Sequence, residues 1–191
     1  MRHSPFTAFY DANVLYPAPL RDYLMHLALT GVYRARWSAL IHEEWKRNLL
    51  INRPELTREQ LDRTSSLMDK AVPDGIVTEY EPLIEGLTLP DADDRHVLAA
   101  AIKCNASVIM TFNLKDFPKS ALDAFDIEPL HPDDFIADLW DLDQAAVLEA
   151  AQRQRASLKN PPHSAREYLD KLLQQKLPET VKLLSGFEFL I

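Results

Sequence analysis

The sequence predicts a three-layer α/β sandwich with a mostly parallel sheet, followed by a C-terminal helical extension. Two observations support this fold class. Short apolar runs alternate with amphipathic helical patterns through about residue 130, and only helical patterns follow His131. Alternation of this kind is typical of βαβ units, which build parallel sheets covered by helices. We therefore expect an α/β domain over residues 1–131 and a helical extension over residues 132–191.

The expected strands are short apolar or alternating runs bounded by turn residues. They fall at residues 6–10, 32–37, 75–80 and 106–112. The expected helices carry terminal signals: Pro19 near a start, Gly31 just past an end, and Ser38 at a cap position. Thr57 with Gln60, and Ser164 with Glu167, have the spacing of capping boxes. These signals predict helices at residues 19–30, 39–52, 57–72, 90–105, 119–125, 133–142, 145–158 and 164–177.

Composition excludes several classes of protein. The chain has 191 residues, 47% of them hydrophobic, and a net charge of −8, which speaks against a protein that coats nucleic acid through a basic field. No apolar run approaches a membrane span, no signal-peptide pattern opens the chain, and the single cysteine fits a reducing compartment, so we expect a cytoplasmic protein. Between residues 34 and 63 basic residues outnumber acidic ones, which fits either a solvated helical face or a patch that contacts phosphates.

The first predicted strand ends on a carboxylate, Asp11. Parallel sheets bind ligands at the carboxyl ends of their strands, so this residue points to a functional site. Aspartate is also common in turns and at helix caps, and the sequence leaves both interpretations open.

Two further carboxylates are expected to point inward from helices. Asp94 is in line with the apolar stripe of its helix, although Asp91 and Asp94 could instead form a reciprocal cap. Glu44 borders an apolar stripe, whereas Glu43 is spaced for a surface ion pair with Arg47.

The loop after the strand at residues 106–112 supplies the last group. That strand ends at Thr111, and Asn113 and Asp116 follow it. Carboxylates cannot share a cleft as anions unless their pKa values rise or a cation binds. Oxygen ligands without paired cysteines or histidines suit Mg²⁺ or Mn²⁺.

Four segments together resemble the PIN-domain nucleases, and among them the VapC toxins of toxin–antitoxin pairs. The segments are YDANVLYP, SALIHEEW, PDADDRHVLAAAI and SVIMTFNLKDFP, which occur in the family's order between residues 7 and 118. The resemblance implies a parallel sheet of about five strands, an RNA substrate, Mg²⁺ or Mn²⁺ as cofactor, and a cognate antitoxin as partner.

The resemblance also implies a role for each matching residue. The catalytic acids fall on Asp11, Glu44, Asp94 and Asp116, and the metal ligands on Asp11, Asp91, Asp94 and Asp116. The fourth acid position is shared between Asn113 and Asp116, because many relatives carry an acid where Asn113 stands. Asn13, Thr111 and Asn113 are expected to line the site.

Two other functions compete with this one. An aspartyl-phosphate phosphohydrolase would use Asp11 as nucleophile, but that chemistry needs an acid two residues later, where Asn13 stands. A non-catalytic module with the same fold would bind RNA or protein. The apolar C-terminus predicts that residues 143–191 dock against protein, either within the chain, in a homodimer or on the antitoxin.

Overall fold

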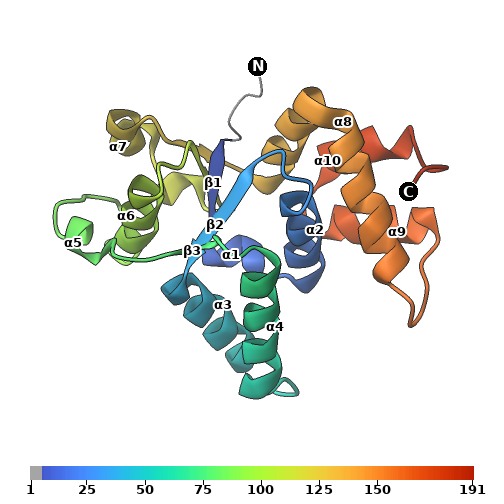
Figure 1. Ribbon diagram of the computed structural model, residues 1–191, viewed down its shortest axis with the longest axis horizontal. Helices are drawn as coiled ribbons and strands as arrows, with labels where there is room; N and C mark the ends of the chain where they lie inside the picture. The colour runs from blue at the N-terminus through green and yellow to red at the C-terminus, as the bar shows by residue number, and fades with distance from the viewer. Residues whose placement is uncertain (1–5) are drawn as a thin grey trace. The chain divides into compact units, whose positions relative to one another are not determined.

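The chain, described by a computed structural model over residues 6–191, contains one five-stranded parallel sheet (Figure 1). Its strands are β1 (Thr7–Tyr10), β2 (Arg34–Ser38), β3 (Ile76–Val77), β4 (Val108–Met110) and β5 (Glu128–Leu130). They are ordered β3-β2-β1-β4-β5, and every neighbouring pair is parallel. This arrangement confirms the predicted α/β class.

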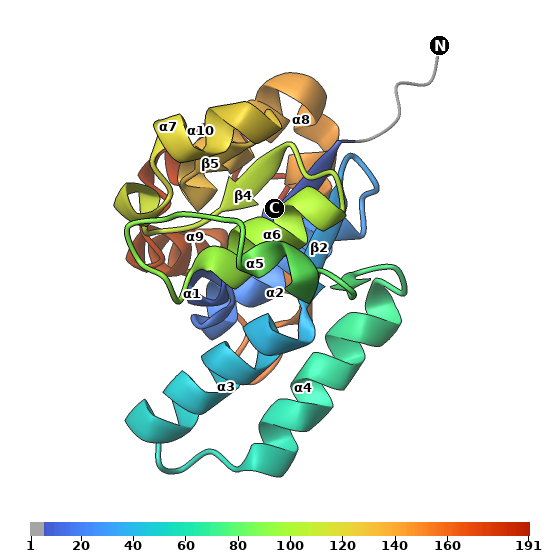
Figure 2. The same ribbon diagram turned by 90° about the vertical axis from the view of Figure 1, so that its left-hand side faces the viewer.

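Helices connect the strands, as the alternating pattern predicted. They are α1 (Ala12–Leu15), α3 (Ala39–Asn52), α4 (Arg58–Ala71), α5 (Glu81–Ile84), α6 (Arg95–Lys103) and α7 (Lys119–Leu122), with 3₁₀ turns η1 (Leu114–Asp116) and η2 (Asp123–Phe125). Helices α3 and α4 lie side by side as a hairpin (Figure 2).

Local capping signals determine where the longer helices begin. The Ser38 hydroxyl accepts a hydrogen bond from the Ile41 amide at 3.2 Å and starts α3. Thr57 and Gln60 form the predicted capping box at the start of α4. Each such cap satisfies backbone donors that have no partner inside the helix, so these starts could be predicted from sequence.

The core of the sheet lies around its central strand. All residues of β1 are buried, and α6 packs on β1 and β4 through Val97, Leu98 and Ala101, which are buried. The resemblance implied about five strands, but the sequence pattern did not locate β5, because its sequence EPL is short and contains Pro129. Proline is tolerated at a sheet edge, and β5 is an edge strand.

Contacts divide the chain into two compact units. The sheet unit contains the chain through Tyr16 and again over Tyr33–His131, and the helical unit contains Pro17–Val32 and Pro132–Ile191. The helical unit consists of α2 (Ala18–Ala28), α8 (Pro132–Ser157), α9 (Ala165–Gln174) and α10 (Pro178–Ser185). The predicted domain boundary at residue 131 stays a prediction. The first predicted domain spans residues 1–131, and its residues 1–5 lie outside the described part of the chain.

Buried polar groups join the elements of the helical unit. Asp133 accepts hydrogen bonds from the Glu179 and Thr180 amides and from the Thr180 hydroxyl, at 2.7 to 2.9 Å, and so caps α10. Gln154 of α8 donates to the Pro19 carbonyl at 2.8 Å and accepts from the Tyr168 hydroxyl. Because these bonds run between α2, α8, α9 and α10, they hold the unit together.

The apolar C-terminus is only partly buried. Ile191 is 3% exposed and so is covered within the chain, whereas Phe189 is 81% exposed. Docking of this residue on another protein stays a prediction. Phe187 contacts the Trp140 ring at a centroid distance of 5.4 Å within the same unit.

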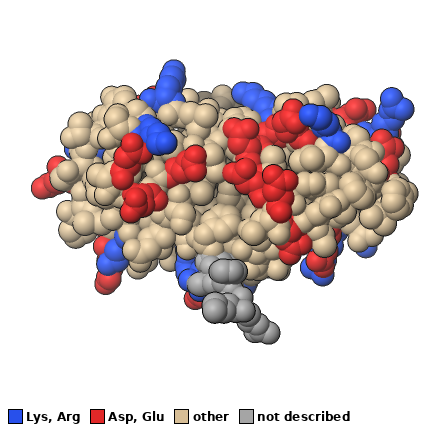
Figure 3. All heavy atoms as spheres, turned by 90° about the horizontal axis from the view of Figure 1, so that it is seen from above, with Lys and Arg blue, Asp and Glu red and all other residues tan. Residues whose placement is uncertain are grey.

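Over residues 6–191, no helix is both long enough and apolar enough to cross a membrane. Acidic side chains gather in groups on the face seen in Figure 3, as expected from the net charge of −8.

Candidate active site

The topology of the sheet brings the ends of β1 and β4 together. The chain runs from β1 outward to β2 and β3, and then crosses to β4 on the other side of β1. Tyr10 and Met110 pair at the ends of these two strands. Open α/β sheets bind ligands at such a switch point, outside the carboxyl ends of the strands. Asp11 and Thr111 follow directly and therefore lie at this place.

Asp11 is a helix cap and a buried acid at once. Its carboxylate accepts hydrogen bonds from the Ala12 amide at 2.6 Å, the Asn13 amide group at 2.7 Å and the Thr111 hydroxyl at 2.7 Å. The residue is 6% exposed. Burial raises the pKa of this carboxyl, while the bonds from Thr111 and Ala12 oppose the rise. Both interpretations of Asp11 left open by the sequence are therefore compatible with the structure.

Asn13 and Thr111 fix the Asp11 carboxylate in place. The Asn13 amide group donates to both Asp11 and the Thr111 hydroxyl, the latter at 3.0 Å, and its oxygen accepts from the Phe112 amide at 3.1 Å. The Thr111 hydroxyl also accepts from the Asn113 amide at 2.9 Å. These bonds connect the residues after β1 to those after β4.

Asp94 precedes the first residue of α6 and is half-buried. Its side chain makes no capping hydrogen bond, and Asp91 instead accepts from the Asp93 amide at 2.9 Å. The reciprocal cap of Asp91 and Asp94 is therefore absent. Burial, and then the charges of Asp11, Asp91 and Asp116, raise the pKa of Asp94 to about 6. This carboxyl is placed where several negative charges act on it.

The fourth acid position remains divided between two residues. Asn113 lines the same cleft as Asp11 and Asp94, whereas Asp116 lies in η1 and acts on Asp94 through its charge. Asp91 is exposed and acts on Asp94 in the same way.

Glu44 reaches the site in company with a histidine that sequence reasoning missed. Its carboxylate lies 2.9 Å from Nε2 of His96, and its charge also raises the pKa of Asp11. His96 is 6% exposed, and its Nδ1 has no hydrogen-bond partner within the described chain. Its position two residues after Asp94, beside the buried stripe of α6, was the available signal.

The neighbouring Glu43 has the surface role expected of it, but with other partners. It pairs with Lys46 at 2.8 Å and Arg58 at 2.7 Å, and not with Arg47. Asp62 also binds Lys46 and Arg58. These basic side chains are thus neutralised by acids, which favours an ion-paired helical face over a phosphate-contacting patch.

A cleft of about 350 Å³ opens beside these groups. Asp11 and Asp94 both line it, together with Ala12, Asn13, Tyr16, Asn48, Asn52 and Asn113. Sequence reasoning missed Tyr16, Asn48 and Asn52. The two asparagines follow Glu44 at the i+4 and i+8 positions of α3, so helical spacing was the signal that could have found them.

The chemistry of these donors fits a hard divalent cation. They are oxygen atoms of carboxylates and amides, and burial, with a smaller contribution from neighbouring negative charges, raises the pKa values of Asp11 and Asp94. Within residues 6–191 no three acid, histidine or cysteine side chains are placed closely enough to enclose an ion. Two carboxylates with water completing the shell are a usual arrangement for Mg²⁺.

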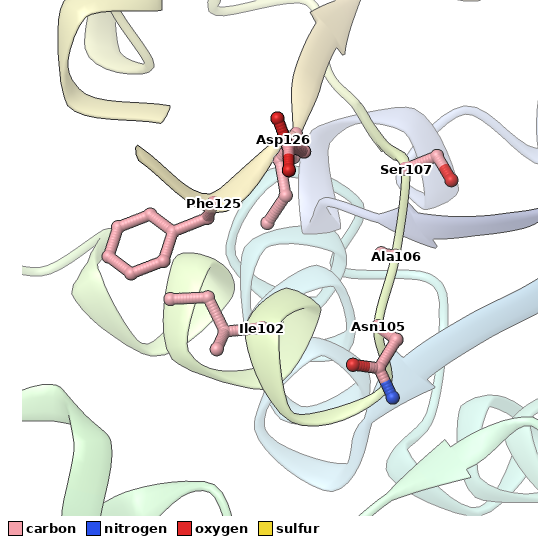
Figure 4. Close-up of a pocket in the computed structure, with 7 residues that line it drawn as sticks. Ile102, Asn105, Ala106, Ser107, Phe125 and Asp126 are labelled. Atoms are coloured by element: carbon pink, nitrogen blue, oxygen red, sulfur yellow. The ribbon is translucent and has the colours of Figure 1, made fainter. Parts of the chain in front are cut away.

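A second cleft, of about 240 Å³, lies near the amino ends of β4 and β5 (Figure 4). Its lining includes Ile102, Asn105, Ser107, Phe125 and Asp126. Only one acid, Asp126, contributes to it, whereas two acids, Asp11 and Asp94, line the cleft at the other end of the strands.

This chain is therefore an α/β protein with an acidic cleft at the switch point of its parallel sheet, and the cleft is suited to binding a cation. Residues 7–115 match the PIN domain, and residues 132–186 match the VapC50 C-terminal domain. The chain belongs to the PIN-domain family and is VapC-like.

A relative from Mycobacterium tuberculosis (strain ATCC 25618 / H37Rv) is named as a candidate ribonuclease, VapC50. It is 38% identical over 114 residues, which cover 58% of this chain and 67% of the relative. No solved structure matches the chain significantly.

Proposed function

We propose that this chain is a metal-dependent endoribonuclease that hydrolyses RNA phosphodiester bonds, and that it is the toxin of a toxin–antitoxin pair. The observation that carries the proposal is the placement of Asp11 and Asp94 in one cleft, both with raised pKa values. The name of the relative VapC50 as a candidate ribonuclease supports RNA as the substrate.

Asp11 and Asp94 are the proposed ligands of Mg²⁺ or Mn²⁺, with Asp116 and Asp91 near them. A bound divalent cation would lower the pKa of a water molecule and screen the charge of the phosphodiester. Because Asp11 is held by three hydrogen bonds, its carboxylate is oriented before any ligand arrives.

The remaining predicted site residues have supporting roles in this proposal. Thr111 and Asn13 orient Asp11, and Asn113 lines the cleft that receives the substrate. Glu44, held by His96, adds negative charge behind Asp11 and is proposed as a catalytic acid together with Asp116.

The activity is tested by measuring RNA cleavage in the presence and in the absence of a divalent metal. Total RNA is incubated with the purified chain and Mn²⁺ or Mg²⁺, with a chelator, and with the Asp11→Asn variant. We expect cleavage with metal, none with chelator, and at least a 100-fold loss in the variant, the order of loss seen when a positioned acid–base group is removed. Cleavage that persists with chelator would refute the metal-dependent mechanism.

The absence of cleavage under every condition would favour a binding module of the same fold. The melting temperature is then measured with and without metal in the absence of RNA. A rise with metal would show that the chain binds the cation even if it does not cleave RNA, because ligand binding stabilises the folded state independently of turnover.

The proposed partner is a cognate antitoxin that acts with this chain in the cytoplasm. A basic segment of that protein would fit the cleft, since an Arg or Lys there would neutralise Asp11 and Asp94. Expression of the chain alone should arrest growth, and co-expression of the partner should restore it. Free tolerance of the active chain by its host would contradict the toxin assignment.

A further inference from the structure

One wall of the candidate active site carries no charge. It is formed by Tyr16, Asn48 and Asn52, and we refer to these three residues as the amide wall. They face the same cleft as Asp11 and Asp94, yet none of them is used in the proposed chemistry.

The helix α3 determines how far the amide wall lies from the acids. Asn48 and Asn52 follow Glu44 by four and eight residues of the helix, which places them about 6 and 12 Å further along the helix axis. Both side chains are exposed. The wall therefore begins beside the acids and extends away from them along one side of the cleft.

One half of the amide wall is fixed, and the other is open. The Asn52 amide group donates to the Tyr16 hydroxyl at 3.2 Å, which orients both side chains. Within residues 6–191, the side-chain amide of Asn48 makes no hydrogen bond. Its donor and acceptor atoms are thus turned to solvent at the cleft, one turn from Glu44.

The chemistry of the amide wall distinguishes what it can bind. A phosphate would be bound by Arg or Lys, and none lines this cleft. Asparagine amides instead match the donors and acceptors on nucleobase edges, and an aromatic ring offers a face or an edge for stacking. A single-stranded RNA substrate presents unstacked bases to such groups.

We propose that the amide wall is a nucleobase-binding subsite, and that it reads the identity of a base adjacent to the phosphate that a cation at Asp11 and Asp94 would hold. This inference deepens the proposed ribonuclease function and rests on it for the position of the phosphate. Base recognition can nevertheless be measured without cleavage.

A binding selection tests the subsite. The Glu44→Gln chain, which should cleave slowly but keeps every proposed metal ligand, is mixed with a pool of random eight-nucleotide RNAs and Mg²⁺, and the bound RNAs are sequenced. The same selection is made with Asn48→Ala and Asn52→Ala added. The matched control is Ile51→Ala, a truncation on the same helix at a residue that is 71% exposed and does not line the cleft.

We expect enrichment of particular bases at one or two positions with the parent chain and with the Ile51→Ala control. In Asn48→Ala, and in Asn52→Ala, this enrichment should fall about fivefold or more, since a good amide–base pair discriminates at that level. Overall affinity should fall less, because the other contacts to the RNA remain. The melting temperature of each variant shows that the fold is kept.

Three results would overturn the subsite: no base is enriched by the parent chain, the asparagine variants keep its enrichment, or the Ile51→Ala control loses it equally. Failure of the proposed function has a different signature. If the wild-type chain never cleaves RNA but the amide wall still determines base enrichment, the ribonuclease proposal fails and the subsite stands.

Discussion

Two carboxylate–imidazole pairs involve helix α3, and they differ in how completely they are bonded. His42 contacts Asp69, and Glu44 contacts His96, each through Nε2 of the histidine at 2.9 Å. Both histidines are buried, at 4% and 6% exposed. The pairs are thus alike in contact distance and in the burial of the ring.

Their surroundings are different. Nδ1 of His42 accepts a hydrogen bond from the Trp45 indole at 3.0 Å, and Asp69 also accepts from the Trp37 indole at 2.9 Å. Nδ1 of His96 has no partner in the described chain. In the first pair both ring nitrogens of the histidine are therefore hydrogen-bonded within the core. In the second pair one ring nitrogen is left without a hydrogen bond within residues 6–191, beside a cleft. Incomplete bonding in a buried place is common where a protein binds a ligand.

The largest expected effect concerns activity at the cleft. Asp94→Asn should lower RNA cleavage about 100-fold or more, because it removes a proposed cation ligand. The matched control is Asp93→Asn, a neighbouring exposed acid outside the cleft, which should keep cleavage within about twofold of wild type. Initial rates on one RNA at saturating Mg²⁺ measure both. Equal losses in the two variants would show that charge near α6, and not the position of Asp94, matters.

The next effect concerns the completed pair. His42→Ala should lower the free energy of unfolding by about 2–4 kcal/mol, since it opens a cavity and leaves the Trp45 indole without its acceptor. Denaturant unfolding at pH 7 measures it. The control His26→Ala, whose weak pair with Asp22 spans 3.8 Å, should change stability by less than about 0.5 kcal/mol. A small effect of His42→Ala would mean that this pair does not organise the core.

The incomplete pair should matter less for folding. His96→Ala should cost about 1–2 kcal/mol of unfolding free energy, because one bonded partner is lost instead of two. Cleavage by the folded variant should fall by about tenfold, through misplacement of Glu44. The comparison between the pairs fails if His96→Ala and His42→Ala destabilise the chain equally.

The smallest effect is the dependence of stability on pH. The pKa of Asp94 is about 6 in the folded chain and near its ordinary value of 3.8 when unfolded, so the folded state holds this proton more tightly. Deprotonation of Asp94 therefore lowers the stability of the folded chain progressively as pH rises from about 4 to 6. Above that range the full loss of stability is present. Because the carboxyl is half-exposed, we expect only about 1 kcal/mol after allowance for solvent screening.

The measurement is the difference in unfolding free energy between Asp94→Asn and wild type in chelator. We expect the variant to be more stable by about 1 kcal/mol at pH 7 and equally stable near pH 3.5. Burial lowers the pKa of His42, which acts in the opposite direction, but it contributes equally to both proteins and cancels. A variant that is less stable at pH 7 would instead give Asp94 a structural role.

The sequence predicted those features that depend on neighbours along the chain. Ser38, Thr57 and Ser164 start helices through bonds to residues three positions away, and all three were recognisable. Asp11 could be singled out because it ends a buried strand, and a strand end has a defined place in a parallel sheet.

Features that depend on contacts between distant segments could not be predicted. The contact of Glu44 with His96 joins α3 to α6, and the bond from Asn52 to Tyr16 joins α3 to the residue after α1. The cap at Asp91 was wrong because α6 begins only at Arg95. The helix α10 was also missed, since its N-terminal amides are bonded by the distant Asp133 and not by a local cap.

The membership of α2 in the helical unit has a consequence for synthesis of the chain. This helix leaves the ribosome on the order of a hundred residues before α8 and α9, the helices on which it packs. At translation rates of about 5–20 residues per second, its apolar face waits for several seconds. Leu20, Tyr23, Leu24 and Leu27, all fully buried in the finished fold, are exposed during that time. Nascent chains of this protein should therefore be clients of chaperones that bind apolar segments, up to the moment when the last helices emerge.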